Sequence, residues 1–91
     1  MEKSDTAIRE KTLAPEDFIG HAVLNAWADV LGMDPGSIDP GVSFWDLGGT
    51  SFKSLQMFTI LEKQFPVTID EVALVKHNSV LALSDYIKQN L

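Results

Sequence analysis

Apolar side chains recur at intervals of three and four residues along residues 15–31, the spacing of one buried helical face. Pro15 suits the first position of a helix, and Glu16 and Asp17 would place negative charge at the positive end of its dipole. Gly32 is a residue type that commonly follows a helix end. We therefore expect a helix over residues 15–31. Its predicted inner face consists of Phe18, Ile19, Ala22, Val23, Ala26, Trp27, Val30 and Leu31.

A second stretch with the same spacing predicts a helix over residues 51–64. Pro66 favours an end just before it, because the residue preceding a proline is disfavoured in the α conformation. The predicted inner face consists of Leu55, Phe58 and Leu61, with Met57 and Phe65 as further candidates.

The C-terminal third predicts two further helices. Residues 69–76 suit a short helix, although the run Val72 to Val75 also has the composition of a strand. Ser79 is a good N-cap for a last helix, whose inward positions are Val80, Leu83, Tyr86 and Ile87. The pattern as a whole predicts an all-α fold: a four-helix bundle of three major helices and a short third one.

Two segments lack helical spacing. Residues 1–13 are mostly polar and predict a flexible N-terminal leader before a domain of residues 14–91. Residues 32–50 are rich in glycine and proline and are long for a connection in a small domain. We expect this loop to be ordered, because several apolar side chains can anchor it to the core: Ile38, Val42, Phe44, Trp45 and Leu47.

Composition narrows the possible functions. The 91 residues suit a single domain, and the absence of cysteine excludes disulfides and thiolate chemistry. Thirteen acidic and seven basic side chains give a net charge of −6, which disfavours nucleic acid and anionic membranes and favours a basic partner surface. The polar N-terminus is not a signal peptide, and no apolar run is long enough to span a membrane. We expect a cytoplasmic monomer.

The candidate chemistry lies where the long loop meets the second helix, at Gly48-Gly49-Thr50-Ser51. Glycines let the backbone approach closely, and the unpaired N–H groups of a helix start favour an anion. A phosphodiester on Ser51 would lie in that field. The alternative is that Thr50 or Ser51 is simply an N-cap. No Ser-His-acid arrangement and no metal-ligand spacing can be argued from the sequence, so we predict neither a catalytic residue nor a metal site.

Residues 44–51 match the signature aromatic-x-x-Leu-Gly-Gly-x-Ser, and the chain resembles the acyl and peptidyl carrier proteins. The resemblance extends over residues 15–89 and includes Ala26 to Gly32, Asp34 to Ile38 and Asn78 to Ile87. It is nearer to the peptidyl carriers of nonribosomal peptide synthesis, because fatty-acid carriers usually have aspartate where Thr50 stands. The positions that carry the signature are Phe44, Trp45, Asp46, Leu47, Gly48, Gly49, Thr50 and Ser51.

The resemblance implies that Ser51 receives 4'-phosphopantetheine from coenzyme A, with Asp46 to Thr50 as the supporting motif. A separate phosphopantetheinyl transferase would make the transfer with a divalent metal. The attached thiol would hold an aminoacyl or acyl group as a thioester. The implied partners are this transferase, an adenylation or other acyl-loading enzyme, and downstream condensing or tailoring enzymes. The protein itself would be a carrier with no catalytic activity.

The sequence leaves three pairs of alternatives. Phe52 and Met57 are either buried or exposed contacts for partner enzymes, since both follow the attachment serine on the same helix. An acyl carrier for polyketide or fatty-acid assembly is the alternative to a peptidyl carrier. A helical interaction module in which Ser51 is never modified is the alternative of another class.

Overall fold

The computed structural model describes residues 13–91 as a bundle of α-helices with no strand in that part of the chain, which confirms the all-α prediction. None of these helices is both long enough and apolar enough to cross a bilayer. The predicted leader lies outside the described residues except for Leu13, which packs against the core. The elements are α2 (Phe18–Leu31), the 3-10 turn η1 (Pro35–Ser37), α3 (Ser51–Gln64), α4 (Glu71–Lys76) and α5 (Val80–Gln89).

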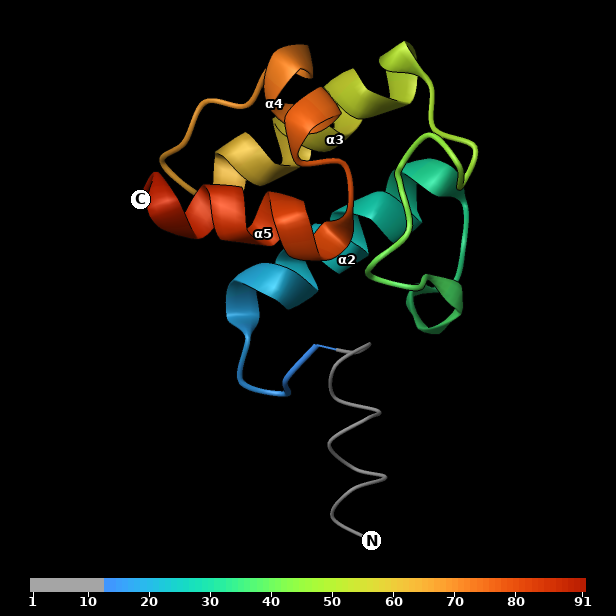
Figure 1. Cartoon of the computed structure of the whole chain (residues 1–91), viewed down its shortest axis with the longest axis horizontal. Helices are drawn as coiled ribbons and strands as arrows, with labels where there is room; N and C mark the ends of the chain where they lie inside the picture. Colours follow the sequence, from blue (N-terminus) through green and yellow to red (C-terminus); the bar gives the residue numbers. More distant parts are fainter. Residues whose placement is uncertain (1–12) are drawn as a thin grey trace, which may run out of the picture.

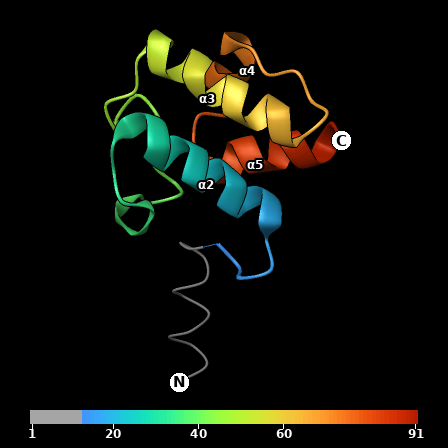
Figure 2. The same cartoon turned by 180° about the vertical axis from the view of Figure 1, so that it is seen from behind.

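Helix α2 is the centre of the bundle and packs against both α3 and α5 (Figure 1). Helix α3 runs back along α2, so that its first residue lies at the end of the bundle away from the C-terminus, as the reverse view also shows (Figure 2). Helix α4 packs against α5. The core that these helices enclose is centred on side chains with no exposed surface, including Val23, Trp27, Phe44, Met57, Leu61, Leu74, Val80, Leu83 and Ile87.

Side-chain caps set the starts of the last three helices. Thr50, Asp70 and Ser79 each accept a hydrogen bond from the backbone N–H three residues later. The predicted bounds of α3 and the predicted cap of α5 are therefore confirmed. Helix α4 is a helix and not a strand, but it begins two residues later than predicted because Asp70 is its cap, and Ile69 is buried in the connection before it.

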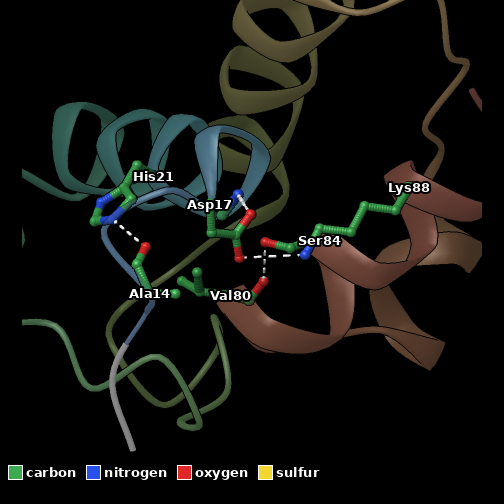
Figure 3. Close-up of polar contacts among 7 residues, drawn as sticks. Ala14, Asp17, His21, Val80, Ser84 and Lys88 are labelled. Atoms are coloured by element: carbon green, nitrogen blue, oxygen red, sulfur yellow. Dashed lines mark hydrogen bonds and ion pairs between the residues drawn. The ribbon is translucent and has the colours of Figure 1, made fainter. Parts of the chain in front are cut away.

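The start of α2 corrects the sequence prediction. The helix begins at Phe18 and not at Pro15, because the Asp17 side chain accepts a hydrogen bond of 2.8 Å from the Gly20 N–H and so occupies the cap position (Figure 3). The predicted burial of Phe18 is also wrong, since 84% of its surface is exposed. A side chain at residue 20 would place its Cβ 2.8 Å from Asp17 Cγ, so the cap requires glycine there.

Asp17 also joins the start of α2 to the last turn of α5. Its Oδ2 lies 3.2 Å from Lys88 Nζ on α5 (Figure 3). Partial burial acts to raise the pKa of the Asp17 carboxyl. The hydrogen bonds from Gly20 and Lys88 and the positive charges of Lys88 and His21 together outweigh this effect and hold the pKa below its ordinary value of 3.8.

We expect Asp17→Ala to lower the free energy of unfolding by about 0.5–2 kcal/mol, the usual range for a lost N-cap. Because the folded-state pKa is depressed, the ionised carboxylate stabilises the fold above pH 3.8, and this contribution is lost as the pH falls through the folded-state pKa. Asp17→Asn keeps the capping oxygen and removes the charge. Its unfolding free energy, measured by urea denaturation, should therefore depend less on pH below about 4 than that of the wild type. An unchanged pH dependence would contradict this account of Asp17.

Candidate functional site

Ser51 is the first residue of α3 and is exposed to solvent. The cap of this helix is Thr50, whose Oγ1 accepts a hydrogen bond of 3.2 Å from the Lys53 N–H. Thr50, and not Ser51, is therefore the N-cap of α3. The helix start does not require the Ser51 hydroxyl, which leaves it available for modification.

Two glycines, Gly48 and Gly49, lie just before the start of α3, and each is required for a different physical reason. Gly48 has a φ of +97°, a conformation that other residues rarely adopt, while a Cβ at this position would meet no atom within 4 Å. Gly49 has no positive φ, but a Cβ there would overlap two ring carbons of Phe44 and lie 2.7 Å from its carbonyl oxygen. Gly48 is thus needed for its backbone angle, and Gly49 for the space that it leaves to Phe44.

Phe44 connects the turn before Ser51 to the rest of the bundle. Its ring is fully buried and meets Trp27 edge-on at a centroid distance of 5.0 Å. Its N–H donates to the Asn78 carbonyl at 2.7 Å, between α4 and α5, and its own carbonyl accepts from the Gly49 N–H at 3.0 Å. The long loop is therefore ordered by core contacts, as predicted.

The remaining motif residues have separate roles. Leu47 is partly buried, packs against the core and donates its N–H to the Phe44 carbonyl at 3.2 Å, whereas Asp46 is exposed. Ser54 is fully buried and donates its hydroxyl to the Ser51 carbonyl at 2.7 Å, a contact that was not predicted from the sequence. Its spacing of three residues from Ser51 is the only sequence signal for this contact.

We expect Gly49→Ala to destabilise the fold by about 1–3 kcal/mol, the usual cost of overpacking a filled core. Because the displaced Phe44 ring contacts Trp27, the NMR resonance of the Trp27 indole N–H should shift. Gly48→Ala should cost about 1–2 kcal/mol through its backbone angle alone and leave that resonance in place. The opposite pattern of shifts would show that the two glycines have been assigned the wrong roles.

Helix α3 resolves the alternatives for the residues after Ser51. Met57 is fully buried, so a role as a partner contact is wrong for it, whereas Phe52 is 70% exposed. Leu55, predicted to face inward, is 55% exposed. Residues 52 and 55 are three apart and share one side of the helix, while residues 54, 57, 58 and 61 occupy the buried side.

Helix α4 extends this exposed apolar surface. Val72 and Val75 are each 62% exposed and lie three residues apart on one side of α4. An open groove of about 480 Å³ between α3 and α4 brings Leu55 and Val72 to the same recess. We call Phe52, Leu55, Val72 and Val75 the apolar face. Only Phe52 was predicted as a candidate contact from the sequence, because helical spacing does not distinguish an exposed apolar stripe from a buried one.

The site is suited to attaching a group and not to binding a metal. Within residues 13–91 there is no cluster of three or more histidine and acidic side chains that could hold a metal ion. An exposed hydroxyl at a helix start can form a phosphate ester, and the free N–H groups of the first turn favour its negative charge. The residues around Ser51 therefore fit a phosphate-linked prosthetic group.

Comparison with known proteins gives three likenesses. Bacitracin synthase 1 of Bacillus licheniformis is 29% identical over 85 residues, which are 93% of this chain but only 2% of that protein. A free-standing peptidyl carrier protein from Acinetobacter baumannii matches with a TM-score of 0.75 at 21% identity, over 79% of this chain and 90% of that one. The A-PCP structure of McyG, complexed with phenylalanyl-adenylate, matches with a TM-score of 0.74 at 23% identity, over 93% of this chain and 13% of that one.

The two solved structures establish the carrier-protein fold, and the family follows from a separate match. Residues 21–87 match the family model described as the phosphopantetheine attachment site, and this range includes the Gly-Gly-Thr-Ser turn and the whole of α3. The chain therefore belongs to the phosphopantetheine attachment-site family, whose members carry 4'-phosphopantetheine as a prosthetic group and serve as carriers and not as catalysts.

Proposed function

We propose that this protein is a peptidyl carrier that holds aminoacyl or acyl intermediates as thioesters on a 4'-phosphopantetheine arm attached to Ser51. The observation that carries the proposal is the position of Ser51: exposed, first in α3, and relieved of capping by Thr50. The likeness to Bacitracin synthase 1 over 93% of the chain, together with a likeness to a nonribosomal peptide synthetase of Aspergillus flavus over 45% of it, supports a role in nonribosomal peptide synthesis. We place the protein in the cytoplasm with the enzymes that it serves.

The attachment step requires only a hydroxyl from this chain. The Ser51 oxygen forms a bond to the pantetheine-bearing phosphorus of coenzyme A, while the bond from that phosphorus to the adenosine bisphosphate breaks. A phosphopantetheinyl transferase supplies the base that takes the Ser51 proton and the divalent metal that stabilises the leaving group. Once attached, the group supplies a thiol. The chain has no cysteine that could compete for the cargo.

The apolar face is the surface that we assign to partner enzymes. Phe52 is adjacent to Ser51 in the chain, so an enzyme that reaches the Ser51 oxygen approaches this side chain. The proposed partners are the transferase, an adenylation or other acyl-loading enzyme, and condensing or tailoring enzymes. The McyG structure, in which A and PCP portions are present together, supports an adenylation partner. Because this face is apolar, the affinity of a partner enzyme for it should depend weakly on salt. The net charge of −6 acts on the association step instead and favours encounter with a partner that has a basic surface.

A loading assay distinguishes the peptidyl carrier from its alternatives. The protein, first modified with coenzyme A and a broad-specificity transferase, is offered to amino-acid-activating and to fatty-acyl-activating enzymes. We expect an amino acid to be attached through a bond that hydroxylamine cleaves, as a thioester requires. Loading only by the fatty-acyl enzymes would instead identify an acyl carrier. Failure of the modification itself would favour an unmodified interaction module.

A further inference from the structure

The connection between α3 and α4, residues 65–70, is held by two side chains from other parts of the bundle. Glu62, on the last turn of α3, accepts a hydrogen bond of 2.8 Å from the Ile69 N–H. Tyr86, on α5, donates its hydroxyl to the Thr68 carbonyl at 3.2 Å. Both bonds fall within the three residues that precede α4, so they fix the point from which this helix starts.

Helix α4 needs such support because it is short. It has six residues, packs against α5, and buries Ala73 and Leu74 while leaving Val72 and Val75 exposed. An isolated helix of this length is unstable, and its position depends on what holds its ends. The groove that Leu55 of α3 shares with Val72 of α4 exists only if α4 is held in place.

We propose that Glu62 is a positioning residue for partner recognition. Its carboxylate fixes Ile69, and thereby α4, so that the α3 and α4 halves of the apolar face form one surface. This inference rests on the proposed function of that face. Glu62 does not act on the attachment serine itself: the two lie eleven residues apart on α3, about 16 Å along the helix axis at 1.5 Å per residue.

The test measures transferase kinetics with coenzyme A and magnesium, varying the concentration of the carrier. For Glu62→Ala we expect KM to rise by about threefold to tenfold, the fold-change that matches the net free energy of one hydrogen bond. We expect kcat to be unchanged. Glu62→Gln keeps an oxygen that can accept from the Ile69 N–H and should restore the wild-type KM. Tyr86→Phe, which keeps the ring beside His77, should raise KM in the same direction. Lys63→Ala, at the neighbouring exposed position, is the matched control and should behave as the wild type.

Amide hydrogen exchange provides the second readout. Exchange at Ile69 should be faster in Glu62→Ala than in the wild type and unchanged in Glu62→Gln. The proposal is overturned if Glu62→Ala has the wild-type KM, if kcat falls while KM stays constant, or if Glu62→Gln is as impaired as Glu62→Ala. These outcomes differ from a failure of the proposed function, in which the wild-type protein itself would not be modified.

Discussion

Replacement of Ser51 by alanine should abolish the attachment of 4'-phosphopantetheine and leave the bundle folded. The attachment is lost because no other oxygen occupies that position at the start of α3. The fold is retained because Thr50 supplies the cap, so the change in unfolding free energy should fall within about 0.5 kcal/mol, as for other exposed sites. Mass spectrometry after incubation with transferase, coenzyme A and magnesium measures the first effect, and thermal unfolding measures the second.

Thr50→Ala is the matched variant. We expect it to lower stability and to leave the modification intact, which is the opposite of the effects expected for Ser51→Ala. It removes the capping oxygen and should cost about 0.5–2 kcal/mol, yet it keeps the Ser51 hydroxyl and should still be modified. If Ser51→Ala unfolded the domain while Thr50→Ala did not, the Ser51 hydroxyl would have a structural role that contradicts this assignment.

The second large effect concerns partner binding. Phe52→Ala should raise the transferase KM about tenfold or more, because a central aromatic contact commonly contributes at least about 1.4–2 kcal/mol to binding. Stability should change little, since the side chain is 70% exposed. Steady-state kinetics with varied carrier concentration measures the effect.

Phe18→Ala is the control that separates position from residue type. Phe18 is also an exposed phenylalanine, but it begins α2 and lies at the other end of the bundle from Ser51 (Figure 1). Its replacement should leave the transferase kinetics unchanged. Equal effects of the two substitutions, or no effect of either, would remove the basis for assigning the apolar face to partners.

Local signals in the sequence predicted most of the secondary structure. The bounds of α3 follow from Pro66 and the Gly-Gly turn, and the end of α2 follows from Gly32. The start of α2 was predicted three residues too early, because Pro15 and Asp17 are both start signals and only the hydrogen bond to Gly20 decides between them. Such competition between adjacent signals is resolved by side-chain geometry, which the sequence does not contain.

The position of Ser51 at the start of α3 could be predicted from the sequence, but its surroundings could not. Phe52 and Leu55 are exposed while Met57 is buried, and this depends on the rotation of α3 about its own axis against α2. The hydrogen bonds from the Ile69 N–H to the Glu62 carboxylate and from the Tyr86 hydroxyl to the Thr68 carbonyl join residues 7 and 18 positions apart. No local pattern specifies contacts at those separations.

The central claim is that Ser51 carries the prosthetic arm, and peptide mapping after modification tests it most directly. The wild-type protein is incubated with a broad-specificity transferase, coenzyme A and magnesium, digested, and sequenced by tandem mass spectrometry. The account predicts one phosphopantetheine group, located on Ser51 and on no other residue. A group on another serine or threonine, such as the adjacent Thr50, or a folded protein that remains unmodified, would contradict it.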